Sequence, residues 1–193
     1  MKRIKRDFFT RDTAEVAKAL LGSYLLREID GELLRGKIVE TEAYYGRKDP
    51  PSHASSGRTK RSKIMWRKPG LAYVYLVYGI HYMFNVVCEP EGEAGAVLIR
   101  GVEPREGIGR MSRNREGIRQ EHLTDGPGKL TEAFGISREE NRLDLTESDE
   151  LWLEEAKTGK PRKMQSSGRI GISEGKEKQL RFFLADNPCV SGG

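Results

Sequence analysis

The alternation of apolar and polar residues predicts one helix near the start of the chain. Asp12 precedes the apolar positions of residues 14–21, and Glu15 follows it at the spacing of an N-terminal capping box. Gly22 comes directly after the last apolar position, which is typical of a helix end. We therefore predict a short helix over residues 14–21.

Strand-like runs dominate the part that follows. Residues 23–29 and 32–44 flank Asp30-Gly31, a strong signal for a β-hairpin. Residues 71–78 and 81–88 are rich in β-branched and aromatic side chains around Gly79, so a second hairpin is expected. Later elements are predicted as strands at 94–102, 167–172 and 179–184, a short helix at 128–134, and a polar mixture of helix and loop at 101–125.

The segment between the two hairpins has no regular pattern. Prolines and glycines interrupt residues 46–70, which therefore read as a long loop, and long ordered loops are usually functional. The order of strands and helices shows no βαβ rhythm, which favours antiparallel pairing. We predict an α+β fold: a single domain over residues 1–193 with a mostly antiparallel, curved β-sheet, flanking helices and this long basic loop.

Composition narrows the class of protein. Of 193 residues, 36% are hydrophobic and 33% are charged, which is polar for a globular chain but too apolar for a disordered one. No apolar run approaches the roughly 20 residues of a membrane helix, and the basic start lacks the apolar stretch of a signal peptide. We expect a cytosolic protein without membrane contact.

Metal and cofactor chemistry is not indicated. The two cysteines, Cys88 and Cys189, are far apart and form no CxxC motif, so Cys₄ zinc sites and iron–sulfur clusters are not expected. His53, His81 and His122 are the only histidines, and none pair at a spacing of four residues. We expect a protein without a metal or a cofactor.

Charge is distributed unevenly along the chain. Residues 47–68 hold eight basic side chains and one acid, whereas residues 139–155 hold eight acids and one base. The molecule is therefore expected to have a basic side and an acidic side. A concentrated basic stretch suits a polyanion such as a phosphate backbone, although charge alone equally fits a solvated loop.

The tyrosines favour a nucleic-acid site. Six of the seven lie between residues 44 and 82, interleaved with the basic stretch. A tyrosine ring offers a flat face on which a base stacks and a polar tip. For any single tyrosine a place in the β core is the simpler reading, but the cluster beside eight cations favours nucleic acid.

Carboxylates lie on one face of the strand at residues 32–44. Side chains alternate between faces, so Glu40, Glu42 and Tyr44 share a face with Ile38. Glutamate is depleted in strands, so this face is either solvated or lines a site, and by facing alone either glutamate could carry chemistry. In the same way Tyr73 and Tyr75 share a face, and further pairs are predicted for Met83 with Asn85 and for Leu98 with Arg100.

Several of these residues form recognisable motifs. They are VETEAY at 39–44, His53, KPG at 68–70, YVYLVYG at 73–79, Asn85, VLIR at 97–100, GPGKL at 126–130 and RIGI at 169–172. In this order they closely resemble the 3-methyladenine (alkyladenine) DNA glycosylase family, over nearly the whole chain.

The resemblance implies a monofunctional DNA repair enzyme. Such an enzyme flips an alkylated purine out of the duplex and hydrolyses its N-glycosidic bond, which leaves an abasic site. Glu42 matches the general base that activates the attacking water, and so the resemblance selects it over Glu40. Arg100 and the backbone carbonyl of Ile170 match the groups that hold this water.

The resemblance also implies how DNA is held. Tyr44, His53 and Tyr75 match the walls that sandwich the flipped base, and Asn85 matches the residue that excludes a guanine 2-amino group. Tyr78 matches the wedge that fills the gap in the base stack. Further contacts to DNA are expected from Leu98, Lys60, Arg61 and Lys129.

Two other activities are weighed against this one. A non-catalytic nucleic-acid-binding module would explain the loop and the tyrosines but not Glu42, because an acid beside phosphates is repulsive unless it has a chemical role. A lyase would need a nucleophilic amine, and Lys37 is the only lysine of these strands near Glu42, so no lyase activity is expected.

The expected partner is double-stranded DNA with alkylated purines, bound by a monomer at a prokaryotic nucleoid or in a eukaryotic nucleus.

Overall fold

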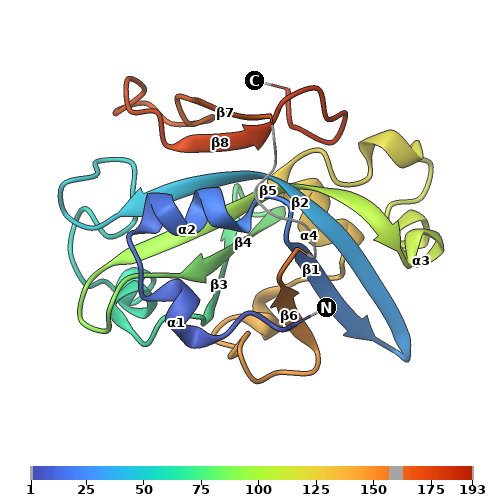
Figure 1. Ribbon diagram of the computed structural model, residues 1–193, viewed down its shortest axis with the longest axis horizontal. Helices are drawn as coiled ribbons and strands as arrows, with labels where there is room; N and C mark the ends of the chain where they lie inside the picture. Colours follow the sequence, from blue (N-terminus) through green and yellow to red (C-terminus); the bar gives the residue numbers. More distant parts are fainter. Residues whose placement is uncertain (1, 157–162, 193) are drawn as a thin grey trace.

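The computed structural model describes residues 2–156 and 163–192 (Figure 1). Its centre is an antiparallel sheet of eight strands in the order β3-β4-β5-β2-β1-β6, with β8 beside β2 and β7 beside β8. The α+β class with its antiparallel sheet is therefore confirmed. The strands are β1 (Tyr24–Ile29), β2 (Glu32–Tyr45), β3 (Ala72–Val77), β4 (His81–Val87), β5 (Gly95–Glu106), β6 (Leu151–Glu154), β7 (Met164–Ser167) and β8 (Arg181–Leu184).

Helices flank this sheet. The predicted first helix is α2 (Thr13–Leu20), and the Asp12 side chain caps it by accepting from the backbone N–H groups of Ala14 and Glu15. α2 packs against β2 and β5, and α4 packs against β4 and β5. The other helices are α1 (Arg6–Phe9), α3 (Ile108–Asn114), α4 (Pro127–Ala133) and short 3₁₀ turns at Ser62–Trp66, Gln120–His122 and Arg138–Glu140.

The long strand β2 organises the molecule. It pairs with β5 along one edge, and with β1 and then β8 along the other. Its register with β5 shifts on both sides of Glu40, which is the signature of a β-bulge. Figure 1 shows β2 and β5 crossing the molecule as long ribbons, with the red β7–β8 pair lying beside them. Residues 40–42 thus lie where three strands meet.

Both predicted hairpins are present. Asp30 and Gly31 have φ values of 53° and 78° between β1 and β2. Tyr78 and Gly79 have φ values of 53° and 74° between β3 and β4. Positive φ is strained for a tyrosine, so its place in this turn is set by the hairpin around it.

The basic loop is anchored to the sheet rather than loose. Ala54, Ile64 and Met65 of the loop form a small apolar cluster with Leu71, Tyr73, Val87 and Ala96. The main core lies elsewhere, between the sheet and α2, α3 and α4. Burial of this second cluster fixes the loop beside β3, β4 and β5.

Two expectations need correction. The strand predicted at 167–172 is wrong beyond Ser167, where β7 ends, because Arg169 turns inward and pairs with the buried Asp49. The basic and acidic stretches are not kept on opposite sides either. Lys68 of the first pairs with Asp144 of the second at 2.8 Å, and Glu140 is buried against Arg27.

Candidate active site

A cleft of about 310 Å³ opens where the β3–β4 hairpin, β5 and the segment after β7 meet. Side chains two apart on β3, on β4 and on β5 all face this one space, as the alternation predicted. Of the predicted site residues, the cleft brings together Tyr44, His53, Tyr75, Tyr78, Asn85, Leu98, Arg100 and Ile170.

The Glu42 carboxylate lies directly beneath the cleft. Its side chain is 0% exposed, and its three hydrogen-bond partners all line the cleft. Oε2 accepts from the Tyr44 hydroxyl at 2.8 Å and from Arg100 Nη1 at 3.3 Å, and Oε1 accepts from the backbone N–H of Ile170 at 2.8 Å. Oε1 thus accepts a single hydrogen bond from the described residues, which leaves it able to accept one from a further donor.

Glu40 shares this face of β2 but has different surroundings. Its Oε1 accepts from Nε of Arg100 at 3.0 Å and from Nε of Arg181 at 2.7 Å, while Ser191 donates to both of its oxygens. Burial disfavours the charged form of Arg100, but the carboxylates of Glu42 and Glu40 outweigh this effect and raise its pKa. The two glutamates lie on the same face of β2 but differ in their surroundings. Glu40 is enclosed by two arginines and Ser191, whereas Glu42 borders the cleft.

Aromatic side chains form the cleft wall opposite the carboxylate. Nδ1 of His53 and the hydroxyl of Tyr73 lie 2.7 Å apart. The ring centroid of Tyr75 is 4.5 Å from that of His53 and 5.0 Å from that of Tyr73. Tyr73 was not assigned a role from the sequence, although its shared face with Tyr75 was the available signal.

The wall is uncharged near neutral pH. Burial lowers the pKa of His53, and the positive charge of Arg61 lowers it further. Burial also raises the pKa of Tyr44, and it raises the pKa of Tyr75 to about 12. A base in the cleft therefore meets neutral rings, with the fixed charges of Glu42 and Arg100 behind them.

Asn85 is held in one orientation. It is buried in the cleft wall opposite Leu98, its register partner on β5. Its side-chain amide donates to the backbone carbonyl of Tyr73 at 3.1 Å and reaches the backbone carbonyl of Met83 at 3.5 Å. A fixed amide can exclude a competing polar group as well as bind one.

The turn between β3 and β4 forms an apolar tip at the rim of the cleft. Tyr78 is 88% exposed there, and the neighbouring Leu76 and Ile80 are exposed too. A hydrogen bond from the Ile80 N–H to the Val77 carbonyl closes the turn. Exposed apolar side chains at such a position suit insertion between stacked bases.

A second, larger hollow of about 910 Å³ borders the cleft at Tyr78. Lys60 and Arg61 of the basic loop line it, and so do Arg138 and Arg142. Arg142 is the one base of the acidic stretch at residues 139–155, and Arg138 directly precedes that stretch. Basic residues from two distant segments thus gather beside the exposed tyrosine.

Two other basic side chains are already paired with acids. Lys129, at the start of α4, donates to Asp125 Oδ1 at 2.9 Å. Lys68 bonds to Asp144 at 2.8 Å, which is also bound by Arg6. These lysines are less available to phosphates than those lining the larger hollow.

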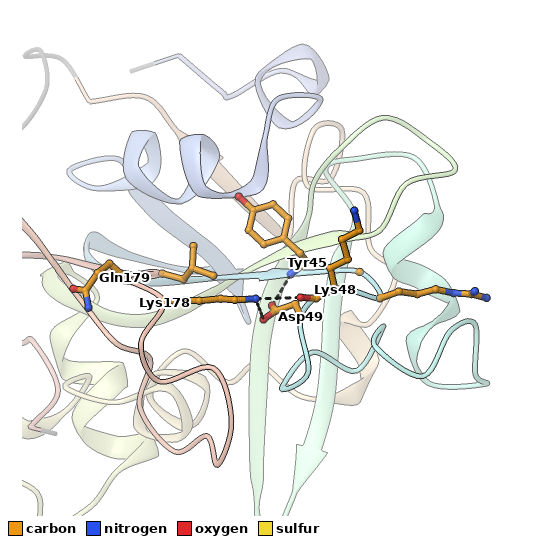
Figure 2. Close-up of a pocket in the computed structure, with 8 residues that line it drawn as sticks. Tyr45, Lys48, Asp49, Lys178 and Gln179 are labelled. Carbon is orange, nitrogen blue, oxygen red and sulfur yellow. Dashed lines mark hydrogen bonds and ion pairs between the residues drawn. The ribbon is translucent and has the colours of Figure 1, made fainter.

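A buried ion pair lies behind the Tyr44 ring, and no pattern in the sequence indicated it. Arg169 donates to both oxygens of Asp49, at 2.7 and 2.6 Å, and its guanidinium lies 4.6 Å from the Tyr44 ring centroid. Burial opposes ionisation of Asp49, but its hydrogen bonds with Arg169 hold its pKa below the ordinary value. Figure 2 shows Asp49 between Lys178 and the backbone of Tyr45, at the edge of a separate hollow.

Within the described ranges, no group of three or more His, Cys, Asp or Glu side chains is arranged to hold a metal ion. No helix in the same part of the chain is long and apolar enough to cross a membrane.

The aromatic cleft, the buried carboxylate and the neighbouring basic surface fit an enzyme that acts on a base of a nucleic acid. The sequence profile of the family described as methylpurine-DNA glycosylase (MPG) matches residues 7–188. The chain belongs to this family, so it is a DNA glycosylase, a hydrolase of N-glycosyl bonds that serves DNA repair. The resemblance seen in the sequence is thereby confirmed, and the non-catalytic module is excluded.

Relatives cover the whole chain. A protein of Prosthecochloris aestuarii is 46% identical over 192 residues, covering 99% of this chain and 92% of its own length. One of Carboxydothermus hydrogenoformans is 45% identical over 188 residues, covering 97% and 98%. One of Clostridium botulinum is 43% identical over 201 residues, covering 98% of each. All three carry the provisional name 3-methyladenine DNA glycosylase.

Proposed function

We propose that this DNA glycosylase flips alkylated purines, with 3-methyladenine foremost, out of double-stranded DNA and hydrolyses their N-glycosidic bond with a water activated by Glu42. The observation that carries the proposal is the contact of Glu42 with Arg100 and Ile170 beneath an aromatic cleft. The provisional names of the relatives support the choice of 3-methyladenine, and deaminated or etheno-bridged purines are further candidates.

The chemistry follows from the charges of the site. Bond cleavage passes through an oxocarbenium-like sugar, which the Glu42 carboxylate stabilises while it takes a proton from the water. Arg100 and the Ile170 backbone position the water. An alkylated purine with a positive charge is already a good leaving group, so no separate acid is required.

The walls of the cleft suit an extruded base. Extrusion costs a few kcal/mol of lost stacking, and stacking on an aromatic side chain returns about 1–3 kcal/mol per base. Tyr44 on one side and His53 with Tyr75 on the other provide such faces, and Tyr78 fills the gap in the duplex.

The enzyme is proposed to be monofunctional and monomeric. No lysine is among the described residues that line the cleft, so a Schiff base with the sugar has no amine to form from. The relatives named above are bacterial, which together with a DNA substrate supports action at a prokaryotic nucleoid rather than in a nucleus.

The test is the variant Glu42→Gln, with Glu32→Gln as a matched control. Glu32 lies on the same strand but is partly exposed, and it pairs with Arg113 at 2.7 Å. Glu42→Gln should bind methylated duplex as the wild type does and release base about 10² to 10⁴ times more slowly, whereas Glu32→Gln should match the wild type. Abasic-site formation in a single turnover measures both. Release by Glu42→Gln near the wild-type rate would show that another group is the base.

A further inference from the structure

The far side of the Arg100 guanidinium is held by the last described residues of the chain, and the proposal here rests on the proposed role of Arg100 at the water. We infer that Ser191 is a positioning residue for catalysis: together with Glu40 it clamps Arg100 so that Nη1 faces Glu42. Among the described residues that line the cleft, Ser191 and Glu40 form hydrogen bonds only with Arg100, so both act through Arg100 rather than on the base.

Every polar group of Ser191 takes part in this clamp. Its backbone N–H donates to Glu40 Oε2 at 2.7 Å, and its hydroxyl donates to Glu40 Oε1 at 2.8 Å. The hydroxyl also accepts from Arg100 Nη2 at 3.2 Å, and the backbone carbonyl accepts from Arg181 Nη2 at 3.0 Å. A hydroxyl with one hydrogen and two lone pairs satisfies both of its contacts at once.

The tail reaches this position by close packing on β5. Ser191 is 8% exposed, so it is buried although it lies near the end of the chain. A Cβ atom added to Gly101 would come within 2.5 Å of the Cys189 carbonyl oxygen, so only glycine lets the tail lie this close to the strand. Gly101 follows Arg100 directly, and thus the tail docks at the arginine itself.

The clamp also balances charge. Glu40, Glu42, Arg100 and Arg181 form a buried group with two negative and two positive side chains. Without Glu40, Glu42 would be the one carboxylate left in this group beside two arginines. With Glu40 held by the tail, Nε of Arg100 is engaged behind and Nη1 is left to Glu42 in front.

Loss of the clamp should change the rate of the chemical step, whereas a loss of stability alone should change only the fraction of folded enzyme. Removal of the Ser191 hydroxyl takes one acceptor from Arg100 and one donor from Glu40 but leaves the backbone contacts. Arg100 then gains freedom to rotate, so the water is held less well in the transition state while DNA binding is unchanged. A residue that only tied down the tail would affect folding and would leave the rate of the chemical step in the folded enzyme unaltered.

The experiment compares Ser191→Ala and Ser191→Thr with the control Ser166→Ala, an exposed serine on β7. We expect Ser191→Ala to slow single-turnover base release about tenfold at saturating enzyme, with an unchanged Kd for methylated duplex; the lost buried hydrogen bonds lower the melting temperature modestly but leave the enzyme folded at the assay temperature. Ser191→Thr keeps the hydroxyl and should recover most of the rate. Ser166→Ala should match the wild type throughout.

Three results would overturn the inference. They are an unchanged release rate in Ser191→Ala, a loss explained wholly by a lower melting temperature, or a Ser191→Thr variant as slow as Ser191→Ala. Failure of the proposed function itself looks different, because the wild type would then release no base from methylated duplex. As a second readout, Glu40→Gln should slow release at least as much as Ser191→Ala, and combining the two changes should add little, since both act on one clamp.

Discussion

Arg169 and Asp49 form a two-pronged ion pair behind the aromatic wall of the cleft, with N–O distances of 2.7 and 2.6 Å. Both side chains are buried, and Arg169 lies against the ring of Tyr44. The residue that follows, Ile170, donates its backbone N–H to Glu42. One ion pair therefore fixes both a wall of the cleft and the segment that touches the carboxylate.

Removal of one partner should be costly to folding. We expect Asp49→Asn to lower the free energy of unfolding by about 3 kcal/mol, because the buried Arg169 loses its counter-charge. Asp149→Asn is the matched control, since Asp149 pairs with Arg3 at 2.8 Å but its side chain is 96% exposed. Urea unfolding compares the two, and an equal effect would contradict the structural role of the buried pair.

Phosphate contacts should appear in the salt dependence of DNA binding. We expect Lys60→Ala combined with Arg61→Ala to weaken binding to every duplex alike and to flatten the slope of log K against log salt by about 2. Lys68→Ala should leave the slope nearly unchanged, because Asp144 already neutralises Lys68. Binding titrations at several salt concentrations measure the slopes. Variants that lose lesion discrimination at an unchanged slope would argue against phosphate contact.

Asn85 should set the preference between purines. Asn85→Ala removes an amide that is fixed by the Tyr73 carbonyl, and with it the group proposed to clash with a guanine 2-amino substituent. The variant should release more guanine-type bases relative to adenine-type bases. Release from a panel of both lesion types gives the ratio, and an unchanged ratio would remove Asn85 from substrate selection.

Tyr78 should affect base extrusion and leave the chemical step alone. Tyr78→Ser removes an exposed ring, so the melting temperature should stay nearly constant while activity on duplex falls. The loss should be smallest for mispaired lesions, because their extrusion costs less. Single-turnover release from paired and mispaired lesions separates the effects. A destabilised variant with no dependence on pairing would show that Tyr78 only packs the turn.

The acid limit of activity should respond to Arg61. Burial and then the charge of Arg61 hold the pKa of His53 below its ordinary value, so the neutral imidazole persists to lower pH than in a free histidine. Arg61→Gln removes one of these causes, and the pKa of His53 should therefore rise toward about 6.5. NMR titration of the imidazole measures this shift directly. A pKa that stays constant or falls would show that Arg61 does not act on His53.

Local patterns were sufficient to predict much of the site. Alternation along a strand depends only on the backbone, so it correctly grouped Glu40 with Glu42 and Tyr73 with Tyr75. The two hairpins followed from turn residues that adopt positive φ, although β1 and β2 begin or end a residue away from the prediction. Such features are encoded within a few neighbouring residues.

Features that depend on distant segments escaped prediction. The run at 167–172 has a strand-like composition, yet Arg169 and Ile170 turn inward because Asp49 and Glu42 accept their hydrogen bonds. Ser191 shows no local motif, since its partner Glu40 lies 151 residues away in the chain. The position of Arg142 beside Lys60 and Arg61 could not be predicted, because the net charge of a segment does not show which way each side chain points in the fold.

The strained turn that carries Tyr78 bears on how the enzyme searches DNA. A ring mounted on a paired hairpin, with its backbone already at positive φ, requires no loop to close when the enzyme meets a duplex. The proposed wedge is then presented on the same paired hairpin at every base pair. The resistance that it meets comes from the DNA, and a damaged or mispaired step yields more readily than an intact one. Lesions would thus be located by the local deformability of the duplex, before any extruded base binds in the cleft.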